Sequence, residues 1–591
     1  MGNLPSRLID PKVESYDAAR AAFRWPVPER FNIGVSVCDR HADNPEAAGR
    51  EALIHEAYDG TVTRFTFAQV KAASNRLANV LRGRGIERGD RCAVWLPQRP
   101  ETALAHLAIY KLGAIAVPMT VLFRRDAVLY RLQNSGAGAI VCDRELLDII
   151  DDLRPELPDL HTVLVVGDEA ALPGRSGVDR GMLALNEAMG AASDALVPVD
   201  TSADDPCVLI YTSGTTGNPK GALHAHRYLI GHLPGFELSH DFFPQPGDRF
   251  YTPADWAWIG GLTDALLPTW LYGLTNVSFQ GRGAFDPERM LRLMADHQVR
   301  NAFIPPTALK MTAQLSGIRE RYDLNLRTLM SGGEALSSDT LRWAEETLHV
   351  RINEIYGQTE INYLVGNCQS LWPVRPGSMG RPYPGHEVGV VDEQGKALGA
   401  GEVGEVAVRR GEDPVFFLEY WRNPGDTRDK FIGDAASPDS WALTGDLAEM
   451  DGEGYFWFRG RKDDVIISAG HRIGPNEIEN ALLQHPAVAL AAVVASPDPL
   501  RGHIVKAFIK PAPGHTPSEE LSRQIQEFVK ETLARHEYPR AIEYLDEFPL
   551  TPTGKIRRLE LREMEARRAA SPETQKTGAT GATQSNGREG A

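Results

Sequence analysis

Apolar positions between about residues 65 and 210 alternate between a helical period and short continuous runs. The segment FAQVKAASNRLANVLRGRG (67–85) has helical spacing, and the strand-like run RCAVWL (91–96) follows it. The same succession returns over 136–166, where AIVCD, DRELLDIIDDL and TVLVVG predict strand, helix and strand. Short apolar strands that alternate with helices predict a parallel sheet covered by helices.

Two later regions have different patterns. Glycine and proline are dense between 376 and 426, which predicts short strands joined by turns and a smaller β-rich subdomain. After Arg459 the runs VIIS, NEIENALLQH, LAAVVAS and VKAFIKP precede a long helix from about Pro517 to His536, and this order predicts a compact α+β domain.

The pattern therefore predicts an α/β fold combined with an α+β domain. We expect a large N-terminal domain over 1–460, built of helix-flanked sheets with the β-rich subdomain. A small mobile C-terminal domain is expected over 461–569, and 570–591 is expected to be a disordered tail because it has little to bury.

Composition narrows the functional classes. The chain has 591 residues, which is too long for one hydrophobic core. Its net charge of −16 disfavours a nucleic-acid partner. Its 5 cysteines lack zinc-ligand spacing and indicate reduced thiols. Neither a run of 18 apolar residues nor a signal-peptide pattern occurs, so we expect a cytoplasmic protein without a membrane span.

The densest cluster of candidate chemistry is Tyr211-Thr-Ser-Gly-Thr-Thr-Gly-Asn-Pro-Lys-Gly221, which follows the apolar run 207–210. Glycines let a loop present backbone N–H groups, and hydroxyls add donors, so the loop suits polyphosphate oxygens. It is not a Walker A loop, because Asn218 and Pro219 separate Gly217 from Lys220. The candidate phosphate-binding residues are Thr212, Ser213, Gly214, Thr215, Thr216, Gly217 and Lys220.

This loop resembles the signature of the adenylate-forming (AMP-binding) superfamily, which includes acyl-CoA synthetases, luciferases and peptide-synthetase adenylation domains. Further segments resemble that family's motifs in the family order. They are Gly332-Gly333-Glu334-Ala335, Tyr356-Gly357-Gln358-Thr359-Glu360, Trp441 to Asp446, Arg459 to Asp464 with Arg461, and Pro552 to Lys555.

The resemblance implies ATP-dependent, AMP-forming ligation of a carboxylic acid to coenzyme A through an acyl-adenylate. It implies ATP, Mg²⁺ and coenzyme A as cofactors. Lys555 would clamp the carboxylate and the α-phosphate, and Glu360 with Thr215 would hold magnesium. The segment 332–335 would contact adenine, and Asp446 would bind the ribose hydroxyls because a carboxylate accepts two hydrogen bonds.

Other residues are assigned by resemblance to the thioester-forming step. Gly470 and His471 would line a pantetheine tunnel, and Arg472 would meet the adenylate phosphate. Asp463 stands at the family's hinge, so the small domain is expected to alternate between two conformations. Arg501 and Arg540 resemble coenzyme A contacts of the medium-chain acyl-CoA synthetase branch.

The acyl pocket is expected around Trp258, Gly332 and Gly357. Acetate-specific relatives carry tryptophan where this chain has Gly357, so we expect a deeper pocket and a short- to medium-chain fatty acid. Trp256 and Trp258 are equally compatible with core positions. Aromatic and short branched acids stay open.

Three other functions are compatible with parts of the pattern. A stand-alone adenylation enzyme could load a carrier protein, a sensor could hold nucleotide without turnover, and a P-loop kinase could use the glycine-rich loop. Arg501, Arg540, Lys555 and Glu360 favour the ligase. The family's lysine is also an acylation target, so a protein lysine acyltransferase acting at Lys555 is a candidate partner, as is a second copy of the chain in a homo-oligomer.

Overall fold

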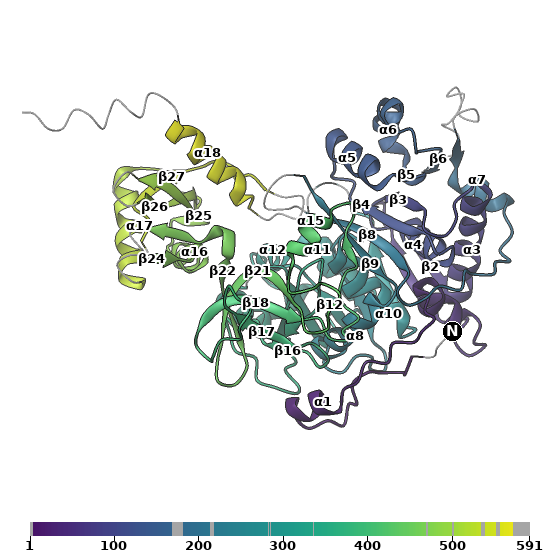
Figure 1. Cartoon of the computed structure of the whole chain (residues 1–591), viewed down its shortest axis with the longest axis horizontal. Coiled ribbons are helices and arrows are strands. Elements are labelled where there is room, and N and C mark those ends of the chain that lie inside the picture. The colour runs from purple at the N-terminus through teal and green to yellow at the C-terminus, as the bar shows by residue number, and fades with distance from the viewer. Residues whose placement is uncertain are drawn as a thin grey trace, which may run out of the picture. The chain divides into compact units, whose positions relative to one another are not determined.

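The computed structural model divides into two units (Figure 1). It describes residues 4–167, 181–212, 218–281, 283, 285–334, 336–468, 471–498, 502–533, 538–550 and 556–570. Unit 1 comprises Met1–Glu402, Val406–Thr444 and Met450–Trp457, and unit 2 comprises Val403–Glu405, Gly445–Glu449 and Phe458–Ala591. In the part of the chain that the structure describes, no helix is long and apolar enough to cross a membrane.

Unit 1 contains an eight-stranded, mostly parallel sheet. In spatial order its strands are β19 (Glu419–Tyr420), β9 (Lys220–Ala225), β8 (Pro206–Thr212), β4 (Ile115–Met119), β3 (Arg91–Trp95), β5 (Ala139–Asp143), β6 (Thr162–Val166) and β7 (Met182–Ala184). Strands β3, β5 and β6 pair in parallel, as the sequence pattern predicts. Only β9 and β19, at one edge, run antiparallel to their neighbours.

Helices cover both faces of this sheet. Alternate residues of β3 enter two separate hydrophobic clusters, Cys92 and Val94 in one and Ala93 and Trp95 in the other. A strand that is buried on both faces is apolar throughout, which explains the continuous run RCAVWL.

The longest helix of unit 1 begins with a capping box, in which Thr66 accepts from Gln69 and the Gln69 side chain accepts in return. The α-helices of unit 1 are α1 (Tyr16–Ala22), α2 (Arg40–Ala42), α3 (Phe67–Gly83), α4 (Pro100–Lys111), α5 (Arg125–Ser135), α6 (Leu147–Leu153), α7 (Leu185–Ala191), α8 (Tyr228–Ser239), α9 (Ile259–Gly261), α10 (Leu267–Leu271), α11 (Pro287–Asp296), α12 (Pro306–Thr312), α13 (Ile318–Arg321), α14 (Ser338–Trp343) and α15 (Pro424–Asp429). Short 3₁₀ or π segments are η1 (Val35–Asp39), η2 (Arg144–Leu146), η3 (Arg154–Glu156), η6 (Leu262–Leu266) and η7 (Ala344–Leu348).

A nine-stranded sheet is the second layer of unit 1. Its order is β16 (Arg381–Pro382), β15 (Val365–Gly366), β14 (Ile352–Tyr356), β13 (Thr328–Gly332), β12 (Asn301–Phe303), β10 (Arg249–Tyr251), β11 (Thr275–Phe279), β1 (Glu51–Glu56) and β2 (Val62–Thr66). The strands from β14 to β1 are parallel to one another.

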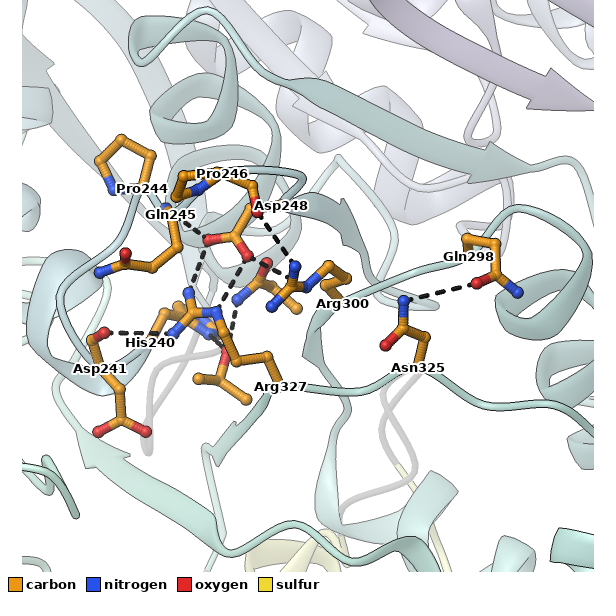
Figure 2. A network of polar contacts seen from close by, with 12 residues as sticks. His240, Asp241, Pro244, Gln245, Pro246, Asp248, Gln298, Arg300, Asn325 and Arg327 are labelled. Atoms are coloured by element: carbon orange, nitrogen blue, oxygen red, sulfur yellow. Dashed lines mark hydrogen bonds and ion pairs between the residues drawn. The ribbon is translucent and has the colours of Figure 1, made fainter.

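Buried ion pairs hold together the amino edge of this sheet (Figure 2). Asp248, Arg300 and Arg327 directly precede β10, β12 and β13. Arg327 donates to both Asp248 carboxylate oxygens at 3.0 and 2.6 Å, and Arg300 Nε lies 3.7 Å from Oδ1. Since Asp248 is 2% exposed, the pairing compensates a buried charge and ties the start of three parallel strands together.

A smaller sheet, in which β20 and β21 pair antiparallel, begins in the glycine-rich region. It contains β17 (Val388–Val391), β18 (Val403–Arg409), β21 (Trp441–Met450), β20 (Phe431–Ile432) and β22 (Phe456–Arg461), in agreement with the predicted β-rich subdomain.

Unit 2 is an α+β fold. The hairpin β23 (Ile466–Ser468) and β24 (His471–Ile473) follows η8 (Lys462–Asp464), and a three-stranded sheet contains β25 (Val488–Asp498), β26 (Gly502–Pro511) and β27 (Ala541–Tyr544). Its helices are α16 (Pro475–Leu483), α17 (Glu519–Thr532) and α18 (Arg558–Ala570). The predicted helix over 517–536 has a shorter described extent. Of the expected tail 570–591, Ala570 is the last residue of α18, and the others lie outside the described residues.

Candidate active site

Three segments with predicted site residues follow parallel strands of the nine-stranded sheet. Residues 252–258 follow β10, Gly332 ends β13 and Tyr356 ends β14. Parallel strands place their carboxyl ends at one edge, and open α/β sheets bind ligands outside that edge. The fold therefore brings these segments to one side, opposite the Asp248 ion pairs.

The glycines after β13 allow a close approach to β14. A Cβ atom at Gly332 would lie 2.6 Å from Ile355 Cγ1 and 2.8 Å from Ile355 O, and Gly333 has φ 95°. Glu334 follows half-buried. Next to this turn, Glu354 accepts the Leu336 N–H at 3.2 Å, and burial raises the pKa of Glu354 to about 7.

Glu360 is the most buried residue of the turn Tyr356–Glu360, with 8% of its surface exposed. Tyr420 donates its hydroxyl to Glu360 Oε1 at 2.5 Å, and the Phe417 N–H donates to Glu360 O at 3.0 Å. Tyr420 belongs to β19 of the other sheet and orients the carboxylate, and Phe417, which precedes that strand, holds the Glu360 backbone.

The phosphate-loop hairpin reaches the same strand. Tyr420 pairs with Ala222 of β9, and the Lys220 ammonium lies 5.3 Å from the Tyr420 ring centroid. Lys220 also forms an ion pair with Asp426 at 2.7 Å, and this hydrogen bond lowers the pKa of Asp426. One tyrosine thus contacts both the predicted metal carboxylate and the predicted phosphate-loop lysine.

Both ends of the phosphate loop are anchored to α5. Thr212 ends β8 and pairs with Lys220, which begins β9. Tyr211 donates its hydroxyl to Asn134 Oδ1 at 2.7 Å, and Tyr130 donates to Pro219 O at 2.9 Å. The loop's two stems are therefore fixed by hydrogen bonds to a single helix.

Gln358 links the turn after β14 to its surroundings. Its Nε2 donates to Thr444 O at 2.6 Å, and Lys430 donates to its Oε1 at 2.8 Å. Tyr356, Gly357 and Thr359 are half-buried in the same turn.

The two tryptophans of the predicted pocket wall differ. Trp256 is fully buried in a core cluster, whereas Trp258 is half-buried and meets Phe123 edge to face at a centroid distance of 5.9 Å. A Cβ atom at Gly357 would lie 2.5 Å from Tyr363 N and 2.6 Å from Asn362 Oδ1. A side chain at residue 357 therefore requires the following turn to move.

Unit 2 contains a separate set of predicted residues. Arg461 donates to Asp446 Oδ1 at 3.0 Å, and its Nε lies 3.4 Å from Asp463 Oδ1. Asp446 is 5% exposed. Lys462 and the Gly445 N–H both donate to Glu405, at 2.9 and 2.8 Å, so the segments 445–446 and 461–463 are held together by charge.

The remaining predicted residues are placed only in part. His471 and Arg472 lie in β24, opposite Ser468 and Ile467, and their side chains lie outside the described part. Arg540 is exposed and donates to Tyr538 Oη at 2.9 Å. The predictions for Ser213, Gly214, Thr215, Thr216, Gly217, Ala335, Gly470, Arg501 and Lys555 fall outside the described residues.

Comparisons with known proteins decide the family. The model of the AMP-binding enzyme matches residues 39–421, and the model of its C-terminal domain matches residues 477–555. The chain belongs to the AMP-binding enzyme family. Acetyl-coenzyme A synthetase of Bacillus subtilis is 37% identical to it over 95% of this chain and 97% of its own, and acyl-coenzyme A synthetase ACSM4 of Rattus norvegicus is 36% identical over 92% of each.

A solved structure supports the same assignment. The anthranilate CoA ligase AuaEII in complex with anthranoyl-AMP covers 92% of this AMP-binding enzyme and 99% of its own chain, with a TM-score of 0.81 and 31% identity. This AMP-binding enzyme is an AMP-forming acid–thiol ligase that uses ATP and coenzyme A. The α/β fold with a small C-terminal domain, predicted from its motifs, is confirmed.

Several polar contacts in the AMP-binding enzyme's site could not be found by motif. Tyr420 and Asp426 lie within the turn-rich region and Lys430 follows it, and nothing in their spacing indicates which distant residue each contacts. For Tyr420 the sequence does contain a signal, because the apolar run 415–418 directly precedes the edge strand that contains it.

Proposed function

We propose that this enzyme activates a short- to medium-chain fatty acid, with magnesium held at Glu360. The observation that carries the proposal is the shared carboxyl edge, where the Trp258 segment, Gly332 and the Glu360 turn follow β10, β13 and β14. Acyl-coenzyme A synthetases that are 36–37% identical over at least 92% of this chain support the acyl class.

The residues at Glu360 fit a magnesium ion. A carboxylate oxygen is the hard ligand that Mg²⁺ prefers, and Mg²⁺ bound with a nucleotide takes most other ligands from phosphate and water. Glu360, oriented by Tyr420, would hold the ion, which would supply charge neutralisation on the polyphosphate.

In the first half-reaction the acid's carboxylate oxygen bonds to the α-phosphorus, the bond to the β-phosphate oxygen breaks, and pyrophosphate leaves. We propose that Lys555 and Arg472 stabilise the negative charge that develops on the carboxylate and α-phosphate oxygens. Asp446 and Arg461 hold the ribose, residues 332–335 contact adenine, and Thr212, Lys220 and the loop between them bind phosphate.

In the second half-reaction the thiol of coenzyme A attacks the acyl carbon, and AMP leaves as the thioester forms. We assign Gly470 and His471 to the pantetheine path and Arg501 and Arg540 to coenzyme A phosphates. Asp463 acts as the hinge between two positions of the 461–569 domain, which follow one another in the cycle.

The acid screen tests the substrate class. Purified protein with ATP, Mg²⁺ and coenzyme A is offered straight-chain acids from C2 to C12, benzoate and anthranilate, and AMP and thioester are measured. We expect equal AMP and thioester with a maximum beyond acetate. A maximum at acetate, or at an aromatic acid, would refute the chain-length assignment.

The acyl acceptor distinguishes the proposed function from an adenylation enzyme that loads a carrier protein. Neutralising Arg540 (Arg540→Ala) is expected to raise the KM for coenzyme A with little change in acid-dependent ATP–pyrophosphate exchange. Exchange without thioester in the unmodified enzyme, or a KM for coenzyme A that does not respond, would favour a carrier-protein acceptor.

A further inference from the structure

A buried carboxylate joins the two segments that form the proposed metal site and acyl pocket. Asp264 lies in η6, which begins directly after Gly261, and is 2% exposed. Asn362 Nδ2 donates to its Oδ1 and Oδ2 at 2.9 and 2.7 Å, and His232 Nδ1 on α8 lies 2.8 Å from Oδ1. Asp264 therefore connects α8, the segment after β10 and the turn after β14.

Asn362 lies directly behind the Glu360 turn. Gln358 and Ile361 exchange backbone hydrogen bonds of 2.9 and 3.2 Å, and the Leu364 N–H donates to Tyr356 O at 3.0 Å, so the turn is a closed unit. Gly357 approaches Asn362 so closely that an added Cβ would lie 2.6 Å from Asn362 Oδ1. Asn362, two residues beyond Glu360 in the chain, is therefore packed closely against Gly357.

The other side of the contact reaches the Trp258 segment. A Cβ atom at Gly260 would lie 3.9 Å from Asp264 Oδ2, and one at Gly261 would lie 2.4 Å from Asp255 O. The backbone at Gly261 is thus closely packed against the residues that precede Trp258. Asp264 and Asn362 together set the distance between this segment and the Glu360 turn.

A buried carboxylate at residue 264 loses its hydration, so it costs free energy that an apolar side chain of the same size would not cost. Burial raises the pKa of Asp264, which His232 and Asn362 oppose by hydrogen bonding. Apolar residues of similar volume pack a buried site at equal or lower cost, but they do not orient an amide. The directional contact to Asn362 is what an apolar residue could not supply.

We infer that Asp264 is a positioning residue that acts through Asn362 and keeps the Glu360 carboxylate and the Trp258 pocket wall at a fixed spacing. This inference rests on the proposed roles of Glu360 and Trp258. It adds a residue pair that couples nucleotide binding to acid selection through the contact between Asp264 and Asn362.

A reciprocal exchange tests the pair. Asp264→Asn leaves only one of the two acceptor oxygens and removes the charge, and Asn362→Asp removes the amide donor and sets two carboxylates against each other. The double variant Asp264→Asn/Asn362→Asp restores an amide–carboxylate pair with the roles reversed. The readouts are the dissociation constant of ATP with and without Mg²⁺, measured by calorimetry, the ratio of kcat/KM between a C4 and a C8 acid, and the melting temperature.

Each single variant is expected to reduce the Mg²⁺-dependent gain in ATP affinity at least tenfold and to change the C4/C8 ratio at least fivefold. The double variant is expected to return both to within threefold of the unmodified enzyme. If Asp264→Asn does not fold, Asn362→Ser removes the amide donor without adding charge and carries the same expectation.

Asp248→Asn is the matched control, because it removes a buried, hydrogen-bonded carboxylate at the opposite edge of the nine-stranded sheet. It is expected to lower the melting temperature and leave both ratios unchanged. Single variants that behave like Asp248→Asn, or a folded double variant that recovers neither ratio, would overturn the inference.

The variant Glu360→Gln tests the proposed metal site independently of the inference about Asp264. If Glu360→Gln leaves the Mg²⁺-dependent gain in ATP affinity intact, the metal assignment is wrong. The C4/C8 ratio of the exchange variants still tests the inference in that case. A ratio that changes in the single variants and returns in the double variant supports the spacing role of Asp264 and Asn362. A ratio that stays unchanged in the single variants contradicts that role.

Discussion

At the scale of single residues, Tyr420 connects groups that lie far apart in the sequence. Its hydroxyl binds the Glu360 carboxylate, its ring faces the Lys220 ammonium, and its backbone lies beside Ala222. A hydrogen bond to a charged group contributes about 1.5–3 kcal/mol. The hydroxyl can therefore be removed while the ring, and with it the strand packing, is kept.

Tyr420→Phe is expected to weaken binding of ATP with Mg²⁺ about tenfold or more, since a loss of 1.4 kcal/mol is a tenfold change. Isothermal calorimetry measures this change. Tyr16→Phe is the control, because it removes a buried hydroxyl that donates to Pro382 O at 2.8 Å elsewhere in unit 1. Equal losses of affinity in the two variants would contradict the role of Tyr420.

Gly357→Ala tests how tightly the Glu360 turn is packed. The new Cβ would lie 2.5 Å from Tyr363 N, so we expect the turn to shift at a cost of about 1–3 kcal/mol in unfolding free energy. Catalytic efficiency is expected to fall for every acid, because the shift moves Glu360 whatever the chain length.

Gly452→Ala is the control for that substitution, since its added Cβ would have nothing within 4 Å. A selective loss for long acids alone, with an unchanged melting temperature, would instead show that the methyl group enters the acyl pocket.

The sequence predicted these residues unevenly. Gly332, Gly357 and Glu360 could be named because their neighbours form recognisable local motifs. Tyr420, Asp264 and Asn362 could not, since each acts through a contact that depends on how separate strands and helices pack. Trp256 and Trp258 have the same residue type and lie two positions apart, and only packing distinguishes the buried one from the half-buried one.

At the scale of elements, local periodicity predicted α3, β3, β5, β6 and α16 close to their described bounds. These elements are long or strongly apolar, so their hydrophobic pattern can be recognised in the sequence alone. Strands β15 and β16 have two residues each, and β27 is half-buried throughout, so neither length nor periodicity indicated them. Such strands form because a longer neighbour offers hydrogen-bonding partners.

Helix α8 provides an element-scale prediction on pH. Every residue of α8 is buried, including Glu237, whose carboxylate accepts the Leu8 and Ile9 N–H groups at 2.7 and 2.8 Å. Burial raises the pKa of Glu237 from 4.5 to about 7. The native state therefore binds this proton more tightly than the unfolded chain, so the stabilisation is complete below pH 4.5 and is lost as the pH rises through 7.

Glu237→Gln removes this titration. The difference in unfolding free energy between the unmodified enzyme and the variant is expected to fall by about 3 kcal/mol between pH 4.5 and 7 and to stay constant above. Urea unfolding of unit 1 at a series of pH values measures it. A difference that is constant from pH 5 to 8 would contradict the raised pKa.

At the scale of the whole molecule, the proposed catalytic groups are divided between two units. Unit 1 holds the Glu360 turn and the phosphate-loop stems, and unit 2 holds Asp446, Arg461 and the proposed hinge Asp463. The order of the motifs led us to expect a boundary at residue 460, with Asp446 on its N-terminal side, whereas Asp446 belongs to unit 2. Unit 2 has a core of its own, because the hydrophobic cluster around Ile478 and Ile509 is formed from residues after 465.

The division makes the two half-reactions separable by mutation. Lys555→Ala is expected to lower acid-dependent ATP–pyrophosphate exchange at least a hundredfold, because a cationic clamp on the reacting oxygens contributes a factor of about 10²–10³. Thioester formation from supplied acyl-adenylate and coenzyme A is expected to stay within threefold, since that step no longer needs the α-phosphate clamp. Lys510→Ala, at an exposed lysine of β26, is the control and should change neither rate. Equal losses in both half-reactions would mean that Lys555 serves one common arrangement of the two units, and the alternation at Asp463 would then have to be abandoned.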